Sequence, residues 1–503
     1  MQTANRLALM GLLALAAACG DDTRNAVSGL VAPQVTAMAR YFDVNRNGIV
    51  DAGDQIVVPF DTEIKVSPGA DGTAFRLGVV GDSWGVGATV THGPAPGDAT
   101  ITLGAGANLR IGGRFATSAT TAGSSSGIDV AGDVNGMIEE DDTDVDADRT
   151  EHIDITPGFV KSVQNLGQGP SFAVATGDVD GDLDLDLVFG TGNGARLWLN
   201  DGNGTFTVSL QSFGVGTVRS VVLANFDGAP GLDLALGVAT PGGGIRTYGN
   251  VAGVFTPTAQ GSFGTADNTQ HLVAVDIDGD LQLDLVAANG SPGGSAPNRI
   301  WTNDGLGTFT DSTIVLGGGD TREILVFDID ADTDLDIVEL NFNQPDLVWK
   351  GDGTGDFISN GEIALSLSRA NGAAVADVDG DLDLDFVEGN GDLLSPERSL
   401  VWINNGTGTF TRDHEFGVTS TSDVILADFD GDGIEDFLQV NSGEPTNLFV
   451  NRDDIFRDLR QRIDAGQAQA AVAGDFDGDG TLDVAFASGN SGPNQVWFGS
   501  DID

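Results

Sequence analysis

The amino-acid sequence predicts an all-β protein, a seven-bladed β-propeller preceded by a small β-sandwich-like domain. Three observations lead to this fold class. A nine-residue acidic segment, first seen as "DVDGDLDLD" from Asp178, recurs seven times, with successive starts 47 to 52 residues apart. Short apolar runs of strand length flank every copy, as "FAVAT" and "LVFG" flank the first. Glycine supplies 73 of 503 residues, about twice the usual share, which favours many tight turns.

Each repeat also holds a third run with an aromatic residue and a glycine turn into a fourth run, as in "RLWLNDGNGTFTVSL". Four strands in about 50 residues is the size of one propeller blade. The aromatic residue recurs in every repeat, which predicts core packing rather than ligand stacking. These aromatic residues are Trp198, Tyr248, Trp301, Trp349, Trp402, Phe449 and Trp497.

The last repeat ends after three strands and would leave an open sheet edge. The segment "PGFVKSVQNLG" from Pro157 aligns with "GTFTVSLQSFG" from Gly204, the fourth strand of the first repeat. We therefore expect residues near Gly158 to Gln164 to complete the seventh blade and close the ring. The propeller is then expected to occupy residues 154–503.

The acidic segments place carboxylates at positions 1, 3, 5 and 9 of a turn, an alternation that directs oxygens toward one hard cation. Calcium accepts six to eight oxygen ligands in irregular geometry, so calcium is the expected ion. Plain polar hairpin turns are the alternative, but in such turns the crowded like charges would repel one another without a cation. The predicted ligands are Asp178, Asp180, Asp182 and Asp186; Asp276, Asp278, Asp280 and Asp284; Asp328, Asp330, Asp332 and Asp336; Asp377, Asp379, Asp381 and Asp385; Asp428, Asp430, Asp432 and Asp436; and Asp475, Asp477, Asp479 and Asp483.

The second copy, "NFDGAPGLD", differs from the other six. Asn225 replaces the carboxylate at position 1, Ala229 removes the one at position 5, and Pro230 stiffens the turn. Only Asp227 and Asp233 remain. We expect this loop to bind calcium weakly or not at all.

The spaced copies of "DxDGDxxxD", followed by "W-x-N-x-G-x-G-T-F", resemble the FG-GAP/VCBS repeat family over roughly residues 155 to 500. The best-known member of that family is the propeller of integrin α-subunits. The resemblance implies a calcium-bearing propeller of FG-GAP/VCBS type. The sequence departs from the family at the sixth loop position, where glycine is usual. Glycine occurs there only as Gly433 and Gly480, and the other complete loops have Leu183, Leu281, Thr333 and Leu382.

The first residues combine a basic Arg6, an apolar run from Leu7 to Ala18, and the only cysteine, Cys19. Residues 1–18 are predicted to be a secretion signal. The end of this segment, "LAAAC", resembles the lipobox of bacterial lipoproteins, which implies lipidation of Cys19; ordinary signal cleavage is the alternative. Gly20 follows the cysteine, so the aspartate of the inner-membrane retention signal is missing, and an outer-membrane or cell-surface lipoprotein is expected. Residues 19–36 are expected to form a tether.

Residues 37–115 are expected to form the β-sandwich-like domain and contain another candidate calcium loop. Its potential ligands have a spacing close to that of an EF-hand, although no helices flank them, and a polar hairpin is the alternative. Residues 116–153 are rich in Ser, Thr and Gly and then in acid, which predicts a flexible linker. The candidate ligands are Asp43, Asn45, Asn47, Asp51 and Asp54.

The formal charge of −52 excludes nucleic-acid binding and limits membrane contact to the lipid anchor. The four histidines are scattered, and no nucleophile or cofactor motif is found, so an enzyme is not expected. We expect a monomeric adhesion or recognition protein that binds a protein or glycan on the face opposite the calcium loops. A carbohydrate lyase or dehydratase on the same scaffold is the alternative. Candidate ligand contacts in the loops between second and third strands include Asn289, Arg299, Arg398 and Glu444.

Overall fold

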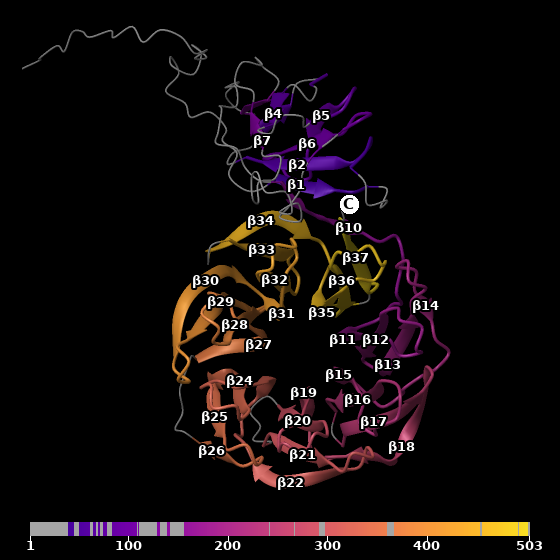
Figure 1. Ribbon diagram of the computed structural model, residues 1–503, viewed down its shortest axis with the longest axis vertical. Helices are drawn as coiled ribbons and strands as arrows, with labels where there is room; N and C mark the ends of the chain where they lie inside the picture. Colours follow the sequence, from indigo (N-terminus) through magenta and orange to yellow (C-terminus); the bar gives the residue numbers. More distant parts are fainter. Residues whose placement is uncertain are drawn as a thin grey trace, which may run out of the picture.

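The computed structural model describes most of the chain from residue 39 onward, and all its regular elements are β-strands (Figure 1). Within these residues, no helix is long and apolar enough to cross a membrane. The signal, the tether and Cys19 lie outside the described residues. The described residues are 39–44, 50–60, 64–66, 69–70, 74–77, 83–107, 109, 128–130, 138–140, 155–240, 242–265, 267–290, 297–359, 367–452, 455–490 and 492–500.

Each repeat of the sequence folds as a four-stranded antiparallel unit, here called a blade and numbered in chain order. In the first six blades the strands follow one another in space as they do in sequence, and the seventh blade takes its fourth strand from the segment before the first repeat. The first three blades contain β11 (Ser171–Gly177), β12 (Asp186–Thr191), β13 (Gly194–Leu199) and β14 (Thr207–Val208); β15 (Val218–Ala224), β16 (Asp233–Val238), β17 (Gly244–Val251) and β18 (Val254–Phe263); and β19 (Thr269–Val275), β20 (Asp284–Asn289), β21 (Arg299–Asn303) and β22 (Phe309–Val315).

The fourth and fifth blades are joined into one eight-stranded sheet because β24 also pairs with β27. The remaining blades contain β23 (Thr321–Phe327), β24 (Asp336–Pro345), β25 (Leu347–Gly351) and β26 (Phe357–Ser359); β27 (Leu367–Ala376), β28 (Asp385–Asp392), β29 (Ser395–Asn404) and β30 (Phe410–Thr419); β31 (Thr421–Ala427), β32 (Asp436–Asn441), β33 (Thr446–Arg452) and β34 (Ile455–Ile463); and β35 (Ala468–Gly474), β36 (Asp483–Ser488), β37 (Gln495–Gly499) and β10 (Phe159–Lys161).

The first strand of each blade lines the centre of the ring. These strands contact one another in order from β11 to β35, and β35 contacts β11 again. Apolar side chains fill the space between neighbouring blades; Val188 of the first blade and Leu234 of the second, for example, are fully buried in one cluster. The all-β propeller that the sequence predicts is confirmed.

The ring is closed by a strand from the other end of the propeller sequence, as the alignment predicts. β10 pairs antiparallel with β37, with Phe159 opposite Gly499. The amide of Gln461 in β34 holds this strand from the other side: its Nε2 donates to the Phe159 carbonyl at 3.0 Å, and the Phe159 N–H donates to its Oε1 at 3.3 Å. The sheet edge of the last blade is therefore covered.

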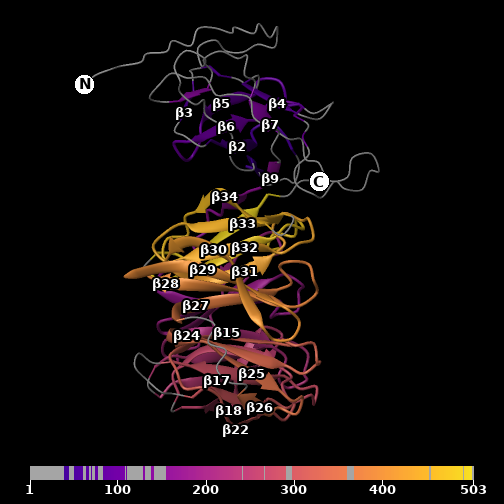
Figure 2. The same cartoon turned by 90° about the vertical axis from the view of Figure 1, so that its left-hand side faces the viewer.

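The N-terminal region forms a separate group of strands beside the propeller edge that contains β34 (Figure 2). Its main sheet has the order β5-β6-β2-β1-β9, and β3 pairs with β8 and β4 with β7. The strands are β1 (Ala39–Phe42), β2 (Gln55–Pro59), β3 (Ile64–Val66), β4 (Phe75–Leu77), β5 (Thr89–His92), β6 (Asp98–Thr102), β7 (Ile128–Val130), β8 (Ile138–Glu140) and β9 (Ile155–Pro157).

Two boundaries of this region differ from expectation. Strands β7 and β8 fall within residues 116–153, the expected linker, and they pair with β4 and β3. Strand β9 lies beyond the expected start of the propeller yet pairs with β1. Gly158, between β9 and β10, donates its N–H to the Tyr41 carbonyl at 2.7 Å, and a Cβ there would lie 2.6 Å from the Phe42 ring. The two domains are thus joined through a close backbone contact.

The recurring aromatic residues lie in the cores between blades, as predicted. Trp301, Trp402, Tyr248 and Phe449 are buried, and the others pack against the same apolar clusters. Trp402 also donates its indole N–H to the buried Glu388 carboxylate at 2.7 Å. Core packing therefore accounts for their repetition.

Candidate functional sites

The predicted metal ligands lie in the loops that join the first and second strands of the blades. In the first blade, Asp178 follows β11, and Asp186, at position 9, is the first residue of β12. Asp186 is fully buried and accepts two backbone hydrogen bonds, from Val179 N–H at 3.0 Å and from Asn200 N–H at 2.9 Å. The equivalent aspartate makes the same pair of bonds in all seven blades.

Burial and the neighbouring acids make these position-9 carboxylates harder to ionise than ordinary aspartates. The pKa is raised from 3.8 to about 6 for Asp186, Asp284 and Asp385, with desolvation as the main cause. It is raised to about 8 for Asp436 and Asp483, where the repulsion of a second aspartate adds to desolvation. A bound cation would offset both the desolvation of these carboxylates and the repulsion between neighbouring aspartates.

The aspartate at position 1 organises the turn itself. Asp178 accepts the N–H of Gly181 at 2.7 Å and that of Leu183 at 3.0 Å. Leu183, at position 6, has a φ of 79°, and the residues at this position in the other five complete loops have similar angles whether or not they are glycine. The departure from the family's glycine therefore leaves the turn unchanged and costs about 1 kcal/mol of backbone strain per loop. The other φ angles are 69° at Leu281, 76° at Thr333, 77° at Leu382, 90° at Gly433 and 87° at Gly480.

The folded loops bring three carboxylates within 4.8 Å of one another in several blades. In four of these clusters the members occupy positions 1, 3 and 9, and the position-5 carboxylate is not a member. In the fourth blade the members occupy positions 1, 3 and 5. The clusters include Asp178, Asp180 and Asp186; Asp276, Asp278 and Asp284; Asp328, Asp330 and Asp332; Asp377, Asp379 and Asp385; and Asp428, Asp430 and Asp436.

The position-3 carboxylates provide an independent sign that a cation fits. Among the described residues, no hydrogen-bond partner reaches the buried Oδ1 atoms of Asp180 and Asp330. A buried carboxylate oxygen without a donor is costly. Oxygen-only ligands in a flexible loop suit calcium.

Five of the seven loops are also held by an asparagine of the next blade, which explains the asparagine of the "W-x-N-x-G-x-G" motif. Asn250 of the second blade donates its Nδ2 to the Val179 carbonyl of the first-blade loop at 2.8 Å. Gly253 has a φ of 78°, and a Cβ there would lie 2.7 Å from the Asp180 Cβ. Loop geometry and blade–blade packing are therefore coupled.

In two loops, a nitrogen group of the protein lies where the other loops are expected to bind the cation. In the second blade, Asn225 Nδ2 donates to the Ala229 carbonyl at 2.5 Å, so an amide closes the turn where other loops have a carboxylate. In the fourth blade, the Lys350 ammonium lies 2.5 Å from Asp330 Oδ2. The sequence pattern anticipated the first exception but not the second, because Lys350 lies 20 residues after Asp330 on another strand.

The N-terminal candidate loop is described only in part, since Asn45 and Asn47 lie outside the described residues. Asp54 is buried and accepts hydrogen bonds from the Tyr41 hydroxyl at 2.9 Å, Val44 N–H at 3.1 Å and Asp51 N–H at 2.9 Å. These contacts resemble those of Asp186. They give Asp54 a role in shaping the turn.

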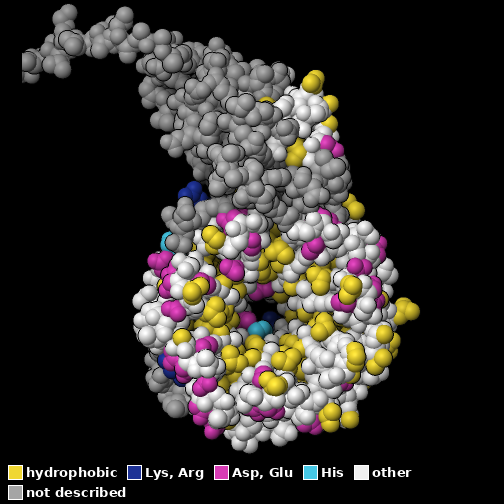
Figure 3. Space-filling model, viewed as in Figure 1, with side chains coloured by type: hydrophobic (Ala, Val, Ile, Leu, Met, Phe, Trp, Pro, Cys, Tyr) yellow, Lys and Arg dark blue, Asp and Glu magenta, His cyan; other side chains and the backbone are white. Residues whose placement is uncertain are grey.

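A cavity of about 660 Å³ opens at the centre of the ring (Figure 3). It lies near the beginning of the innermost strands, which end at the acidic loops on the opposite face. In every blade the first strand has a register shift of one residue at this end, and the extra residue lines the cavity. These residues are Phe172, Arg219, Gln270, Arg322, Asn371, Ser422 and Gln469.

The residues that follow three of these bulges add titratable groups to the wall. His271 Nδ1 lies 3.1 Å from Glu323 Oε1. Burial lowers the pKa of His271 to about 4 and, together with the nearby Asp423, raises that of Glu323 well above its usual value. Both shifts favour the neutral form of the side chain, and His271 Nδ1 also accepts the N–H of Ile324 at 3.4 Å.

None of the ligand contacts predicted from the loops lines this cavity. Asn289 is fully buried and donates to the Pro297 carbonyl, whereas Arg299 pairs with Asp267 and Asp311. Arg398 pairs with Glu415, and Glu444 is exposed. The sequence signal that could have located the cavity is the pair of residues near the start of the first strand of each blade, because these residues change from blade to blade.

Comparison with known families agrees with the repeat pattern. The model of the FG-GAP-like repeat matches residues 276–339 and 428–486. No curated protein matches the chain.

Among solved structures, the chain is similar to a lectin from Agrocybe aegerita described as recognising non-reducing terminal N-acetylglucosamine. That likeness has 21% identity and a TM-score of 0.45 over 64% of this chain and 87% of the lectin. The BP39L lectin from Burkholderia pseudomallei has 13% identity and a TM-score of 0.48, over 67% of this chain and 98% of the lectin. At these identities and scores, neither likeness carries an argument about the ligand.

Proposed function

We propose that this β-propeller with FG-GAP-like repeats binds calcium in its acidic loops and acts in recognition of a protein or glycan. The observation that carries the calcium proposal is the set of three-carboxylate clusters in which the buried Oδ1 atoms of Asp180 and Asp330 have no described hydrogen-bond partner. Calcium would supply the missing positive charge and brace a ring that has no disulfide.

The proposed ligands are the carboxylates at positions 1, 3 and 9, with position 5 adding a further oxygen where the loop allows. The second blade is left out because its turn is closed by the Asn225 amide. In the fourth blade, calcium competes with the Lys350 ammonium for Asp330. We therefore expect the sites to differ in affinity.

The proposed location is the outer membrane or cell surface, with a lipid on Cys19 as the anchor. The charge of −52 supports a role away from nucleic acids and anionic membranes. A monomer that presents the face opposite the acidic loops to a protein or glycan fits this arrangement. Mass spectrometry of the mature N-terminus tests the anchor: a diacylglyceryl-modified cysteine is expected, and an unmodified Cys19 contradicts it.

A carbohydrate lyase or dehydratase remains the second candidate function. The observation that favours it is the pair of acids at the central cavity, Glu323 and Asp423, because burial raises the pKa of both, that of Asp423 to about 6. Carboxyl groups of this kind can exchange protons near neutral pH. Turnover of a polysaccharide that is abolished in Glu323→Gln would favour the enzyme over the recognition protein.

The recognition function is tested with the calcium-loaded protein on a glycan array and, in parallel, by pull-down from cell-surface extracts. Binding that is saturable and lost after dialysis against EDTA supports the proposal. Calorimetric titration of the metal-free protein with calcium measures the sites directly. If no calcium binds at millimolar concentration, the metal proposal fails.

A further inference from the structure

We propose that the central cavity binds a small sugar acid, with its carboxylate on Arg219 and its hydroxyl groups on the opposite wall. This inference rests on the proposed recognition function and names the place and the ligand class. It is carried by three observations: the non-repeating bulge residues, an arginine without an anionic partner, and a wall of hydrogen-bond acceptors.

The bulges single out the cavity as the part of the ring that the repeat does not dictate. A β-bulge redirects one side chain out of the regular alternation, and bulges concentrate beside functional sites. Here every blade has one at the same place, yet the residues differ: Phe172, Arg219, Gln270 and Asn371 are examples. A purely structural position would be expected to repeat, as the buried position-9 aspartates do.

Arg219 provides the cationic end of the site, where the ligand carboxylate would bind. Its guanidinium stacks on the Phe172 ring at 4.8 Å, and among the described residues no carboxylate lies within ion-pair distance of it. Arg322 also lines the cavity, but its guanidinium is paired with Asp320 at 2.9 Å. Burial is the main cause that lowers the pKa of Arg219; the nearby Arg322 lowers it further, and Asp320, which is itself paired with Arg322, acts in the opposite direction. A ligand carboxylate would compensate the charge of Arg219.

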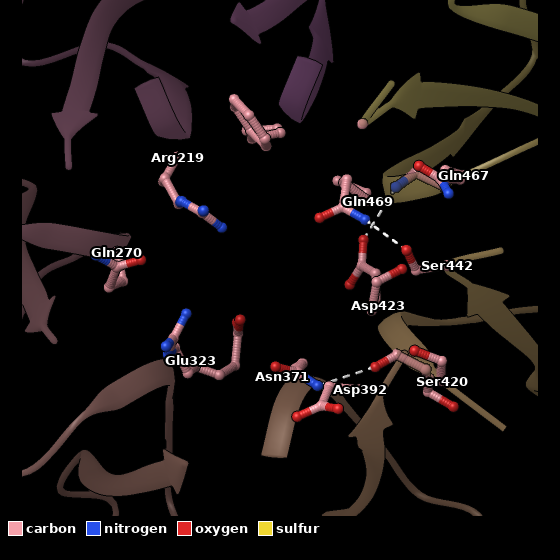
Figure 4. Close-up of a pocket in the computed structure, with 18 of the residues that line it drawn as sticks. Arg219, Gln270, Glu323, Asn371, Asp392, Ser420, Asp423, Ser442, Gln467 and Gln469 are labelled. Carbon is pink, nitrogen blue, oxygen red and sulfur yellow. Dashed lines mark hydrogen bonds between the residues drawn. The ribbon is translucent and has the colours of Figure 1, made fainter. Parts of the chain in front are cut away.

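The opposite wall presents acceptors rather than donors. The amide nitrogens of Gln469 and Asn371 donate to framework groups, to Ser442 Oγ at 2.9 Å and to the Gly391 carbonyl at 2.5 Å respectively. The amide oxygen of Gln270 also points into the cavity, from the side of Arg219, and on the opposite wall the amide oxygens of Gln469 and Asn371 do so as well (Figure 4). Asp423 lies between them, its oxygens held by Val424 N–H at 2.8 Å and Ala471 N–H at 3.0 Å.

A wall of this kind requires a ligand with several O–H donors. The cavity volume of about 660 Å³ is in the range of small-molecule sites. A neutral sugar would leave Arg219 without a partner, and a polyanion would meet Asp423 and Asp392 on the same wall. A sugar with one carboxylate supplies an anion for Arg219 and O–H donors for the acceptors on the opposite wall.

The test is calorimetric titration of the full-length, calcium-loaded protein with sodium glucuronate, galacturonate and N-acetylneuraminate, and with glucose and galactose as neutral counterparts. At least one sugar acid is expected to bind, at least tenfold more tightly than the neutral sugars. Arg219→Gln should weaken this binding at least tenfold, whereas Arg219→Lys should lose less because it keeps the charge. Arg412→Gln is the matched control: this arginine is exposed outside the cavity, so no change is expected.

A second variant covers the case in which Arg219→Gln does not fold. Gln270→Glu is isosteric and places a competing carboxylate in the cavity, so it should also weaken binding at least tenfold. The proposal is overturned if none of the three sugar acids binds, if glucose or galactose binds equally well, or if the folded variants keep wild-type affinity. Array binding that Arg219→Gln leaves intact would retain the recognition function and reject only this cavity.

Discussion

The two faces of the propeller are built from the same strands but follow different rules. On the face with the acidic loops, contacts such as the two backbone hydrogen bonds to Asp186 recur in all seven blades. On the opposite face, the seven bulge residues that line the central cavity are of five different types. The repeated contacts stabilise the closed ring. The variable residues lie where the protein could distinguish one ligand from another.

The acidic face itself contains a smaller contrast. The first-blade loop gathers three carboxylates, whereas the second closes its turn with an amide and the fourth supplies an ammonium. All three keep the position-9 aspartate and its backbone hydrogen bonds. The position-9 anchor of the turn is therefore common to all blades, whereas the group that faces its carboxylates differs from blade to blade.

The largest expected effect comes from removing the metal. Each calcium at a hundredfold excess over its dissociation constant contributes about 2.7 kcal/mol, and several sites act together. We expect the melting temperature to fall by on the order of 10 °C or more in EDTA. Calorimetry with calcium, with EDTA, and with magnesium as the control ion measures this. An unchanged melting temperature would mean that the loops are polar turns only.

The next effect separates the buried and exposed carboxylates within one loop. Asp186→Ala leaves the N–H groups of Val179 and Asn200 without an acceptor, at a cost of about 3 kcal/mol in the free energy of unfolding. Asp182→Ala, at the exposed position 5, is the matched control and should cost less than about 1 kcal/mol. Urea denaturation in EDTA measures both. Equal losses would contradict the assignment of position 9 as the structural anchor.

The third prediction concerns pH. The folded-state pKa of Asp186, Asp284 and Asp385 is about 6, and that of Asp436 about 8, against an ordinary value of 3.8. The metal-free folded state thus holds more protons than the unfolded state between about pH 4 and 8, so its stability falls as pH rises through this window. Calcium binding displaces these protons from the position-9 aspartates. The difference in melting temperature between calcium-loaded and metal-free protein should therefore widen from pH 5 to pH 8, and a constant difference would refute this.

The smallest expected effect tests the fourth-blade exception. Lys350→Met removes the ammonium beside Asp330, which should destabilise the metal-free protein by about 1 kcal/mol. Calcium then has no competitor in this loop, so the stabilisation by calcium should increase. The control is Lys161→Met, since Lys161 lies over the Trp497 ring rather than beside a carboxylate of an acidic loop. A calcium response equal to that of the wild type would show that Lys350 does not compete.

Much of the candidate metal site could be read from the chain because its ligands are close in sequence. Asp178, Asp180 and Asp186 lie within one nine-residue turn, so spacing alone predicts that they meet. The role of Lys350 could not be predicted, since it depends on the register of β25 beside the fourth loop. The strands β7 and β8 were missed because each is three residues long and pairs with a strand far away in sequence.

The sequence by itself determined the repeat, the all-β propeller, the closing strand and the positions of the acidic loops, because each of these follows from local periodicity and short-range spacing. Only the tertiary structure decided what lies at the centre of the ring. The bulge residues of the cavity come one from each blade, about 50 residues apart, and no local pattern joins Arg219 to Asp423. Ring closure brings them together, so their shared chemistry becomes visible only in the folded protein.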